Sequence, residues 1–127
     1  IVIEDDRDIN ELISYNLRRE GFRVEQVHDG LRANERLLRE DYGTVVLDIM
    51  LPGLNGFELC RNIKSRKDAF NTLVIIISAK NSSEDKIYAH LIGADCYISK
   101  PFNVKTLLEI TKELNAIRNR EFIVKVR

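Results

Sequence analysis

Several short segments of this chain are apolar along their whole length, and this feature restricts the fold more than any other. The clearest is Leu-Val-Ile-Ile-Ile at 73–77, and shorter runs of apolar or β-branched residues occupy 1–3 and 44–47. A strand with one face in water alternates apolar and polar residues, whereas a strand in a parallel sheet is covered on both faces and is apolar throughout. Such runs are also far shorter than the roughly 20 residues that a membrane span needs. These segments therefore predict buried parallel strands.

Segments with a helical spacing of apolar residues alternate with these strands. We predict strands at 1–3, 22–27, 44–47, 73–77 and 96–99, and helices at 8–20, 31–40, 57–67, 84–91 and 103 to about 118. The residues expected to face inward are Ile9, Leu12, Ile13 and Leu17 in the first helix, Leu31, Leu37 and Leu38 in the second, and Leu107, Leu108, Ile110 and Leu114 in the fifth. Five strand-helix repeats predict a doubly wound α/β domain, with a five-stranded parallel sheet and five helices.

Length, charge and cysteines restrict the class of protein. The 127 residues are enough for one domain with a substantial core. The 20 basic and 20 acidic residues balance, so no overall positive charge favours nucleic acid, and no basic amphipathic segment favours a membrane surface. Cys60 and Cys96 form no CxxC motif and follow no secretory segment, which predicts a reducing, cytoplasmic location. The chain opens at Ile1 and becomes acidic three residues later, so we expect the start of the first strand to be missing.

Polar side chains stand at four of the predicted strand ends. Glu4, Asp5 and Asp6 follow the first strand, Asp48 ends the third, Ser78 and Ala79 follow the fourth, and Lys100 and Pro101 follow the fifth. Taken singly, an Asp after a strand is more often a turn residue or a helix cap, Ser78 an N-cap, and Lys100 a solvated loop residue. Together they favour a shared site, because ligands of doubly wound sheets bind outside the carboxyl ends of the strands.

Three converging carboxylates restrict the chemistry of such a site. Within about 5 Å of one another they repel by several kcal/mol at an effective dielectric of about 20, which calls for a bound cation, a shifted pKa or a nearby lysine. Ligands that are all oxygen suit Mg²⁺, with Mn²⁺ as the alternative. Magnesium commonly acts together with phosphate, and a carboxylate can attack a phosphoryl group to give an acyl phosphate. We therefore expect Mg²⁺-dependent phosphoryl chemistry, with Lys100 and Ser78 contacting the phosphoryl oxygens.

Four segments resemble the receiver domain of two-component response regulators, the CheY-like superfamily. They are Ile-Val-Ile-Glu-Asp-Asp at 1–6, Leu-Asp-Ile-Met-Leu-Pro-Gly-Leu-Asn-Gly at 47–56, Ile-Ser-Ala at 77–79 and Gly-Ala-Asp-Cys-Tyr-Ile-Ser-Lys-Pro-Phe at 93–102. Several motifs in the family's order and spacing, over residues 1 to about 118, are more specific than any single signature. The resemblance implies a flavodoxin-like fold with strand order 2-1-3-4-5. It also implies a receiver domain at 1–118 and a tail, or the start of a linker to an output domain, at 119–127.

The resemblance implies a role for each residue at the strand ends. Asp48 would accept a phosphoryl group from a sensor histidine kinase or a phosphotransfer protein. Mg²⁺ would be bound by Asp5, by Glu4 directly or through water, by Asp48 and by the Met50 backbone carbonyl. The groups expected to contact the phosphate are Ser78, the Ala79 backbone and Lys100, while Gly56 turns the loop after Asp48 and the bond to Pro101 is cis. Asp6 lies outside the acidic pair and is expected to cap the first helix.

Ser78 and Tyr97 correspond to the switch residues of the family. On phosphorylation the hydroxyl is drawn to the phosphate and the aromatic ring turns inward, which changes the face made by the fourth helix, fifth strand and fifth helix. That face would control an output domain or a partner protein. The domain is thus expected to be a switch, and neither an enzyme acting on an external substrate nor a direct binder of nucleic acid or membrane.

Some residues depart from the patterns of the family. Cys96, Thr106 and Ile110 replace the acidic, acidic and basic residues through which winged-helix regulators pair, so that pairing mode is disfavoured, while a dimer that forms on phosphorylation stays open. An exposed Ile110 would suit an apolar partner, and otherwise it belongs to the inner stripe of its helix. Met50 and Lys80 cannot orient an attacking water, which predicts slow dephosphorylation. The alternating run at 121–127 fits an output-domain strand, a linker, a disordered end or a remnant of expression.

Three other functions fit the residues less well. A phosphohydrolase with an aspartate nucleophile needs a second acid two residues later, where this chain has Met50. A receiver-like module that never carries phosphate is disfavoured, because Asp5, Asp48, Ser78 and Lys100 are all present. A flavodoxin-like cofactor binder needs a Gly-rich or Ser/Thr-rich phosphate loop after the first strand, and this sequence has none there.

Overall fold

Ten elements alternate along the described part of the chain. The computed structural model describes residues 1–66 and 72–126, with the backbone alone described for 120–126. The strands are β1 (Val2–Ile3), β2 (Gln26–Val27), β3 (Thr44–Asp48), β4 (Leu73–Ser78) and β5 (Cys96–Ser99). The helices are α1 (Arg7–Arg19), α2 (Gly30–Arg39), α3 (Gly56–Lys64), α4 (Ser83–Leu91) and α5 (Val104–Val126). Helix α3 ends at Lys64 with Ser65 as its C-cap, before the end predicted at Lys67, which itself lies outside the described residues.

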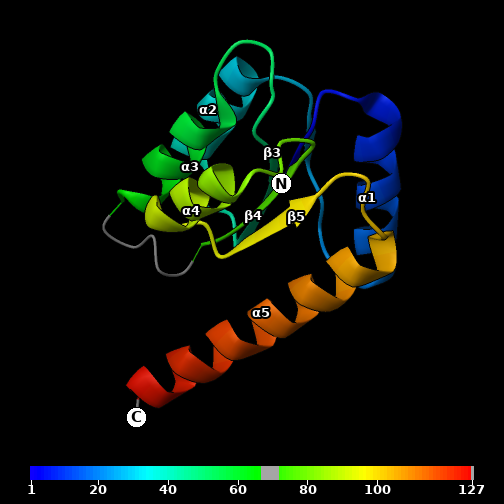
Figure 1. Ribbon diagram of the computed structural model, residues 1–127. Helices are drawn as coiled ribbons and strands as arrows, with labels where there is room; N and C mark the ends of the chain where they lie inside the picture. Colours follow the sequence, from blue (N-terminus) through cyan, green and yellow to red (C-terminus); the bar gives the residue numbers. More distant parts are fainter. Residues whose placement is uncertain (67–71, 127) are drawn as a thin grey trace.

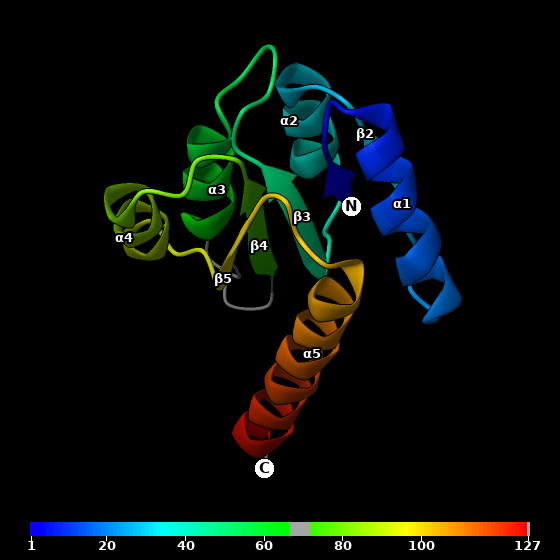
Figure 2. The same cartoon turned by 45° about the vertical axis from the view of Figure 1, so that its right-hand side comes forward.

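The five strands form one parallel sheet in the order β2-β1-β3-β4-β5. Helices α1 and α5 cover one face of this sheet, and α2, α3 and α4 cover the other (Figure 1 and Figure 2). The register pairs Ile3 with Leu47 and Leu47 with Ile76, so the carboxyl ends of β1, β3 and β4 lie side by side. The predicted doubly wound, flavodoxin-like fold with five strands and five helices is confirmed.

Strand β4 shows why the central strands are apolar throughout. All of its residues are buried. Val74 and Ile76 pack in the core on the side of α2, α3 and α4, whereas Ile75 and Ile77 pack with residues of α1 and α5. Because successive side chains of a strand point to opposite faces, a strand between two layers of helices needs an apolar side chain at every position.

Three leucines that were expected to face inward are instead exposed: Leu12 by 49%, Leu31 by 62% and Leu38 by 71%. The residues that α1 and α2 bury are Asn10, Ile13, Ser14 and Leu17 in the first helix, and Gly30, Ala33 and Leu37 in the second. Each exposed leucine is one position away from these stripes, and one residue rotates a helix by about 100°. The other inward-facing predictions are confirmed as buried or half-buried residues of the core, except Ile110, which is half-buried but is not packed against the core.

The largest differences in predicted length concern the second strand and the fifth helix. The strand predicted at 22–27 is reduced to Gln26–Val27, because β1 offers only Val2 and Ile3 as ladder partners. Helix α5 continues to Val126, so a strand at 121–126 is wrong, and in both views the end of α5 extends beyond the rest of the chain (Figure 1 and Figure 2). None of the helices in the described residues has the length and apolar character that crossing a bilayer requires.

Candidate functional site

Acidic side chains from two strand ends meet at the carboxyl edge of the sheet. Glu4 and Asp5 follow β1, and Asp48 ends β3, the strand beside β1. One carboxylate oxygen of each residue lies within 4.8 Å of those of the other two. We refer to these three residues as the acidic cluster. The prediction that carboxylates from these strand ends converge is confirmed.

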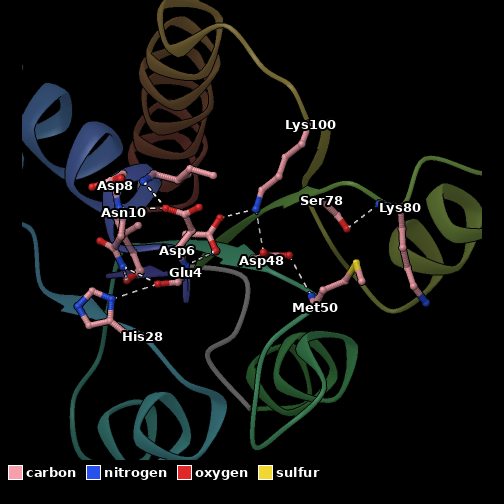
Figure 3. A network of polar contacts seen from close by, with 12 residues as sticks. Glu4, Asp6, Asp8, Asn10, His28, Asp48, Met50, Ser78, Lys80 and Lys100 are labelled. Atoms are coloured by element: carbon pink, nitrogen blue, oxygen red, sulfur yellow. Dashed lines mark hydrogen bonds and ion pairs between the residues drawn. The ribbon is translucent and has the colours of Figure 1, made fainter.

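Lys100, which follows β5, reaches back to the acidic cluster. Its ammonium nitrogen Nζ contacts Glu4 Oε1 and lies 2.9 Å from Asp48 Oδ2. Figure 3 shows this nitrogen between the two carboxylates. Since β4 separates β5 from β3, only a long side chain can cover this distance. The peptide bond between Lys100 and Pro101 is cis, as expected.

Burial controls the protonation of Glu4 and Lys100. Glu4 is fully buried, and burial raises its pKa to about 7, with the charge of Asp48 adding to the rise and the hydrogen bond from Lys100 opposing it. Burial alone would lower the pKa of Lys100, but its hydrogen bonds to Glu4 and Asp48 outweigh that effect and raise it. Lys100 is therefore cationic at neutral pH, while Glu4 exchanges a proton close to neutrality.

The loop after β3 holds Asp48 and approaches it closely. Asp48 Oδ1 accepts a hydrogen bond of 2.9 Å from the Met50 backbone nitrogen, while the Met50 side chain is largely exposed. Gly56, the first residue of α3, donates its backbone N–H to the Ile49 carbonyl at 3.1 Å. A Cβ at Gly56 would lie only 2.3 Å from Ile49 Cα. Gly56 thus permits α3 to begin directly against the end of β3.

Ser78 and Tyr97 are connected through Lys80. Ser78 is fully buried at the end of β4, and its Oγ accepts a hydrogen bond of 3.0 Å from the Lys80 backbone nitrogen (Figure 3). The hydroxyl of Tyr97, on β5, donates to the Lys80 carbonyl. Ala79 lies between Ser78 and Lys80 and is exposed. The two residues predicted to act as a switch therefore both contact one residue of the loop between β4 and α4.

Sequence reasoning missed Asn10 and His28. Asn10 is fully buried and donates hydrogen bonds to main-chain carbonyls, that of Glu4 among them. His28 Nδ1 lies 3.2 Å from the same Glu4 oxygen (Figure 3). An amide three residues before Ile13, on the buried stripe of a helix, is the signal that identifies Asn10. Asp6 caps α1 as predicted, since its carboxylate accepts hydrogen bonds from two amides of the first turn.

Comparison with known proteins agrees with this geometry. The family model for the response regulator receiver domain matches residues 1–112. This chain belongs to that family. Receiver domains are phosphorylation switches of two-component signalling rather than classical enzymes.

Solved receiver domains match this one over most of its length. A CheY-like receiver domain protein from Methanospirillum hungatei JF-1 is 28% identical, with a TM-score of 0.87 and 94% of each chain covered. The receiver domain of the Francisella response regulator 1452 is 32% identical, with a TM-score of 0.80, covering 94% of this chain and 95% of that one. The BeF3-activated receiver domain of Klebsiella pneumoniae RstA is 31% identical, with a TM-score of 0.78, covering 87% and 92%.

The acidic cluster fits a divalent cation of the kind that receiver domains bind. Its three side chains offer carboxylate oxygens, which suit Mg²⁺. Lys100 supplies a single positive charge against up to three negative charges. Burial, together with the charge of Asp48, raises the pKa of Glu4, and a cation beside it would favour the charged form of this carboxyl group.

The three residues that depart from the winged-helix pairing pattern lie on β5 and α5. Thr106 is exposed, whereas Cys96 and Ile110 are half-buried. Ile110 therefore lies between the two alternatives, because it is neither a fully exposed apolar residue nor a core residue. The argument against the winged-helix pairing mode, which rests on the absence of charge at these three positions, stays a prediction.

Proposed function

We propose that Asp48 of this receiver domain accepts a phosphoryl group in a Mg²⁺-dependent reaction, and that the donor is a sensor histidine kinase or a phosphotransfer protein. The observation that carries the proposal is the environment of the Asp48 carboxylate. It is 4% exposed, lies beside two further carboxylates, and is contacted by Lys100. Such a carboxylate has acidic neighbours that can hold a cation and a lysine that can receive an anionic group.

In the proposed reaction, a carboxylate oxygen of Asp48 attacks the phosphorus of a phosphohistidine. A P–O bond forms and the P–N bond breaks, and the electron pair of the broken bond stays on the imidazole nitrogen. Lys100 Nζ, which lies 2.9 Å from Asp48 Oδ2, balances negative charge on the transferred group. Glu4, Asp5, Asp48 and the Met50 carbonyl would hold Mg²⁺, which when bound supplies positive charge beside the phosphoryl oxygens.

Ser78 and Tyr97 carry the proposed response to phosphorylation. The Ser78 hydroxyl and the Ala79 amide would donate to the new phosphoryl oxygens. A shift of Ser78 toward Asp48 would draw its Oγ away from the Lys80 backbone nitrogen. The backbone carbonyl of the same Lys80 accepts the hydrogen bond of the Tyr97 hydroxyl. Movement of Lys80 would release the Tyr97 hydroxyl, and the half-buried Tyr97 ring could then turn inward. This change would alter the face of α4, β5 and α5 that an output domain or a partner protein contacts.

The test of the proposal is intact mass after incubation with acetyl phosphate and Mg²⁺. The wild type is expected to gain one phosphoryl group, whereas Asp48→Ala, or the wild type with EDTA in place of Mg²⁺, gains none. Asp41→Ala is the matched control, because Asp41 is an exposed carboxylate just before β3, at the opposite edge of the sheet. No gain in the wild type would contradict the proposal and favour a module that never carries phosphate.

The same sample reports the lifetime of the phosphorylated state. Met50 and Lys80 are both exposed, and neither side chain is an amide or a carboxylate that can orient an attacking water. We therefore expect slow loss of the phosphoryl group after the phosphodonor is removed. A half-life of only seconds would show that another group orients the water.

A further inference from the structure

The carboxamide of Asn10, on α1, is buried against the ends of β1 and β2. Its Nδ2 donates to the carbonyl oxygens of Glu4 and Val27, at 3.1 Å each, and of Val2, at 3.3 Å (Figure 3). An amide nitrogen carries two hydrogens, so one of them is shared between two acceptors. The donor capacity of this side chain is therefore fully used on main-chain oxygens of the two strands.

The acceptor side of the same amide is also occupied. Asn10 Oδ1 accepts hydrogen bonds of 3.0 Å from Ser14 Oγ and from Gln26 Nε2. These contacts fix which end of the carboxamide faces the strands, because a flipped amide would bring its oxygen against carbonyl oxygens. Asn10 is thus held in one orientation at the point where β1 leads into the acidic cluster.

The contact that matters for the acidic cluster is the one to the Glu4 carbonyl. Strand β1 ends at Ile3, so this buried carbonyl lies beyond the ladder and takes its partners from side chains, Asn10 Nδ2 and His28 Nδ1. The Glu4 backbone nitrogen donates to the Val27 carbonyl at 3.0 Å. The peptide plane that contains the Glu4 oxygen also contains the Asp5 nitrogen, so fixing this oxygen fixes the direction in which the chain leaves Glu4 for Asp5.

We infer that Asn10 is a positioning residue for cation binding: by holding the Glu4 carbonyl it places the Glu4–Asp5 pair opposite Asp48. The inference rests on the proposed function, since it assigns Asn10 to the cation that the reaction needs. Asn10 acts through Glu4 and not through the reacting groups. Outer partners of metal ligands typically change metal affinity about 10- to 100-fold, and a partner of the main chain is expected at the low end, about tenfold.

The experiment is a calorimetric titration of MgCl₂ into the metal-free, unphosphorylated domain. Asn10→Ala is expected to raise the Kd for Mg²⁺ about tenfold. Asn115→Ala is the matched control, because the Asn115 carboxamide also ties a helix to a strand, donating to Thr44 Oγ1 at 3.2 Å, but at the opposite edge of the sheet. Its Kd is expected to equal that of the wild type. Urea unfolding establishes that each variant is folded under the conditions of the titration.

Each outcome decides between positioning and a merely structural role. An unchanged Kd in folded Asn10→Ala, or an equal rise in Asn115→Ala, would overturn the inference. If Asn10→Ala does not fold, His28→Ala removes the second contact to the Glu4 carbonyl from a half-buried position, and a smaller rise in Kd is expected. An unchanged Kd in that variant would overturn it as well. A wild type that binds no Mg²⁺ would instead contradict the proposed function.

Discussion

Among single residues, Glu4 illustrates how burial gives an ordinary carboxyl group an unusual pKa. Its side chain is fully buried and contacts Lys100, whereas its neighbour Asp5 is exposed. The pKa of about 7 follows chiefly from burial. In the metal-free domain, a proton on Glu4 removes its repulsion with Asp48, and under the proposed function a bound cation would compete with that proton.

The raised pKa predicts how stability changes with pH. A carboxyl group whose pKa is about 7 in the folded state and 4.5 in the reference state binds its proton more tightly when folded. Its contribution to stability is therefore complete below pH 4.5 and is lost as the pH rises through about 7. In metal-free buffer, the wild type should lose on the order of 1–3 kcal/mol relative to Glu4→Gln over this range.

Urea unfolding of both proteins at several pH values in EDTA measures this difference. Glu4→Gln keeps the shape of the protonated side chain and does not titrate. The difference in unfolding free energy between the two proteins therefore removes the contribution of groups that titrate alike in both. A difference in unfolding free energy that does not change with pH would show that the pKa of Glu4 is ordinary.

The sequence predicted the charged residues of the acidic cluster but not the amide beside them. Asp48 and Lys100 stand at strand ends, and the topology of a parallel sheet brings such ends to one edge. Asn10 lies inside a helix, and its position in the sequence does not show to which carbonyl oxygens its amide donates. Its partners belong to β1 and β2, and only the packing of α1 on these strands reveals them.

Among the elements, the start of α3 lies directly against the end of β3. A Cβ on Gly56 would meet Ile49 Cα at 2.3 Å and the Asp48 carbonyl oxygen at 2.7 Å. Both are main-chain atoms, so they cannot move aside without shifting the end of β3. The position of this helix therefore depends on the absence of a side chain at Gly56.

Gly56→Ala is expected to lower the free energy of unfolding by about 1–3 kcal/mol, because overpacking of this kind forces the backbone to move. The control is Gly43→Ala, whose Cβ would lie 3.2 Å from Nη1 at the flexible end of the Arg118 side chain. Its effect should stay within about 1 kcal/mol. Urea unfolding of the two variants tests this, and equal losses would show that the crowding at Gly56 is relieved without cost.

Periodicity predicted which elements form, but it predicted their rotation and length less well. Leu31 and Leu38 suggested an apolar face for α2, yet the helix turns Gly30 and Ala33 toward the core. Gly30 is closely packed against the Leu54 backbone, where a Cβ would lie 2.5 Å from the Leu54 oxygen. Such close approach selects small residues for the inner face, and a pattern based on hydrophobicity alone does not detect it.

In the whole molecule, α5 closes one face of the sheet and reaches the amino edge. Among the residues of α5 whose side chains are described, Leu107 and Thr111 are buried. Asn115 and Arg118 contact Thr44 and Gly43 at the start of β3. These contacts all precede residue 119. The boundary between a receiver domain at 1–118 and a following segment stays a prediction, which truncation of the chain can test.

A chain ending at residue 118 is expected to keep the unfolding free energy of the 127-residue chain within about 0.5 kcal/mol. A chain ending at 106 lacks Leu107 and Thr111 and should lose about 3 kcal/mol or more. Urea unfolding of the three chains makes the comparison. A large loss on ending at 118 would show that residues 119–127 are part of the folded domain.

The direction of α5 affects where other proteins can lie around the domain. The helix starts beside the edge that carries Asp48 and Lys100 and ends past the edge where β3 begins (Figure 1). Under the proposed function a phosphodonor approaches the first edge, whereas a protein joined to the end of α5 would occupy space beyond the second. The phosphodonor and the protein joined to α5 would therefore not compete for the same space, and the domain could be phosphorylated while that protein stays attached.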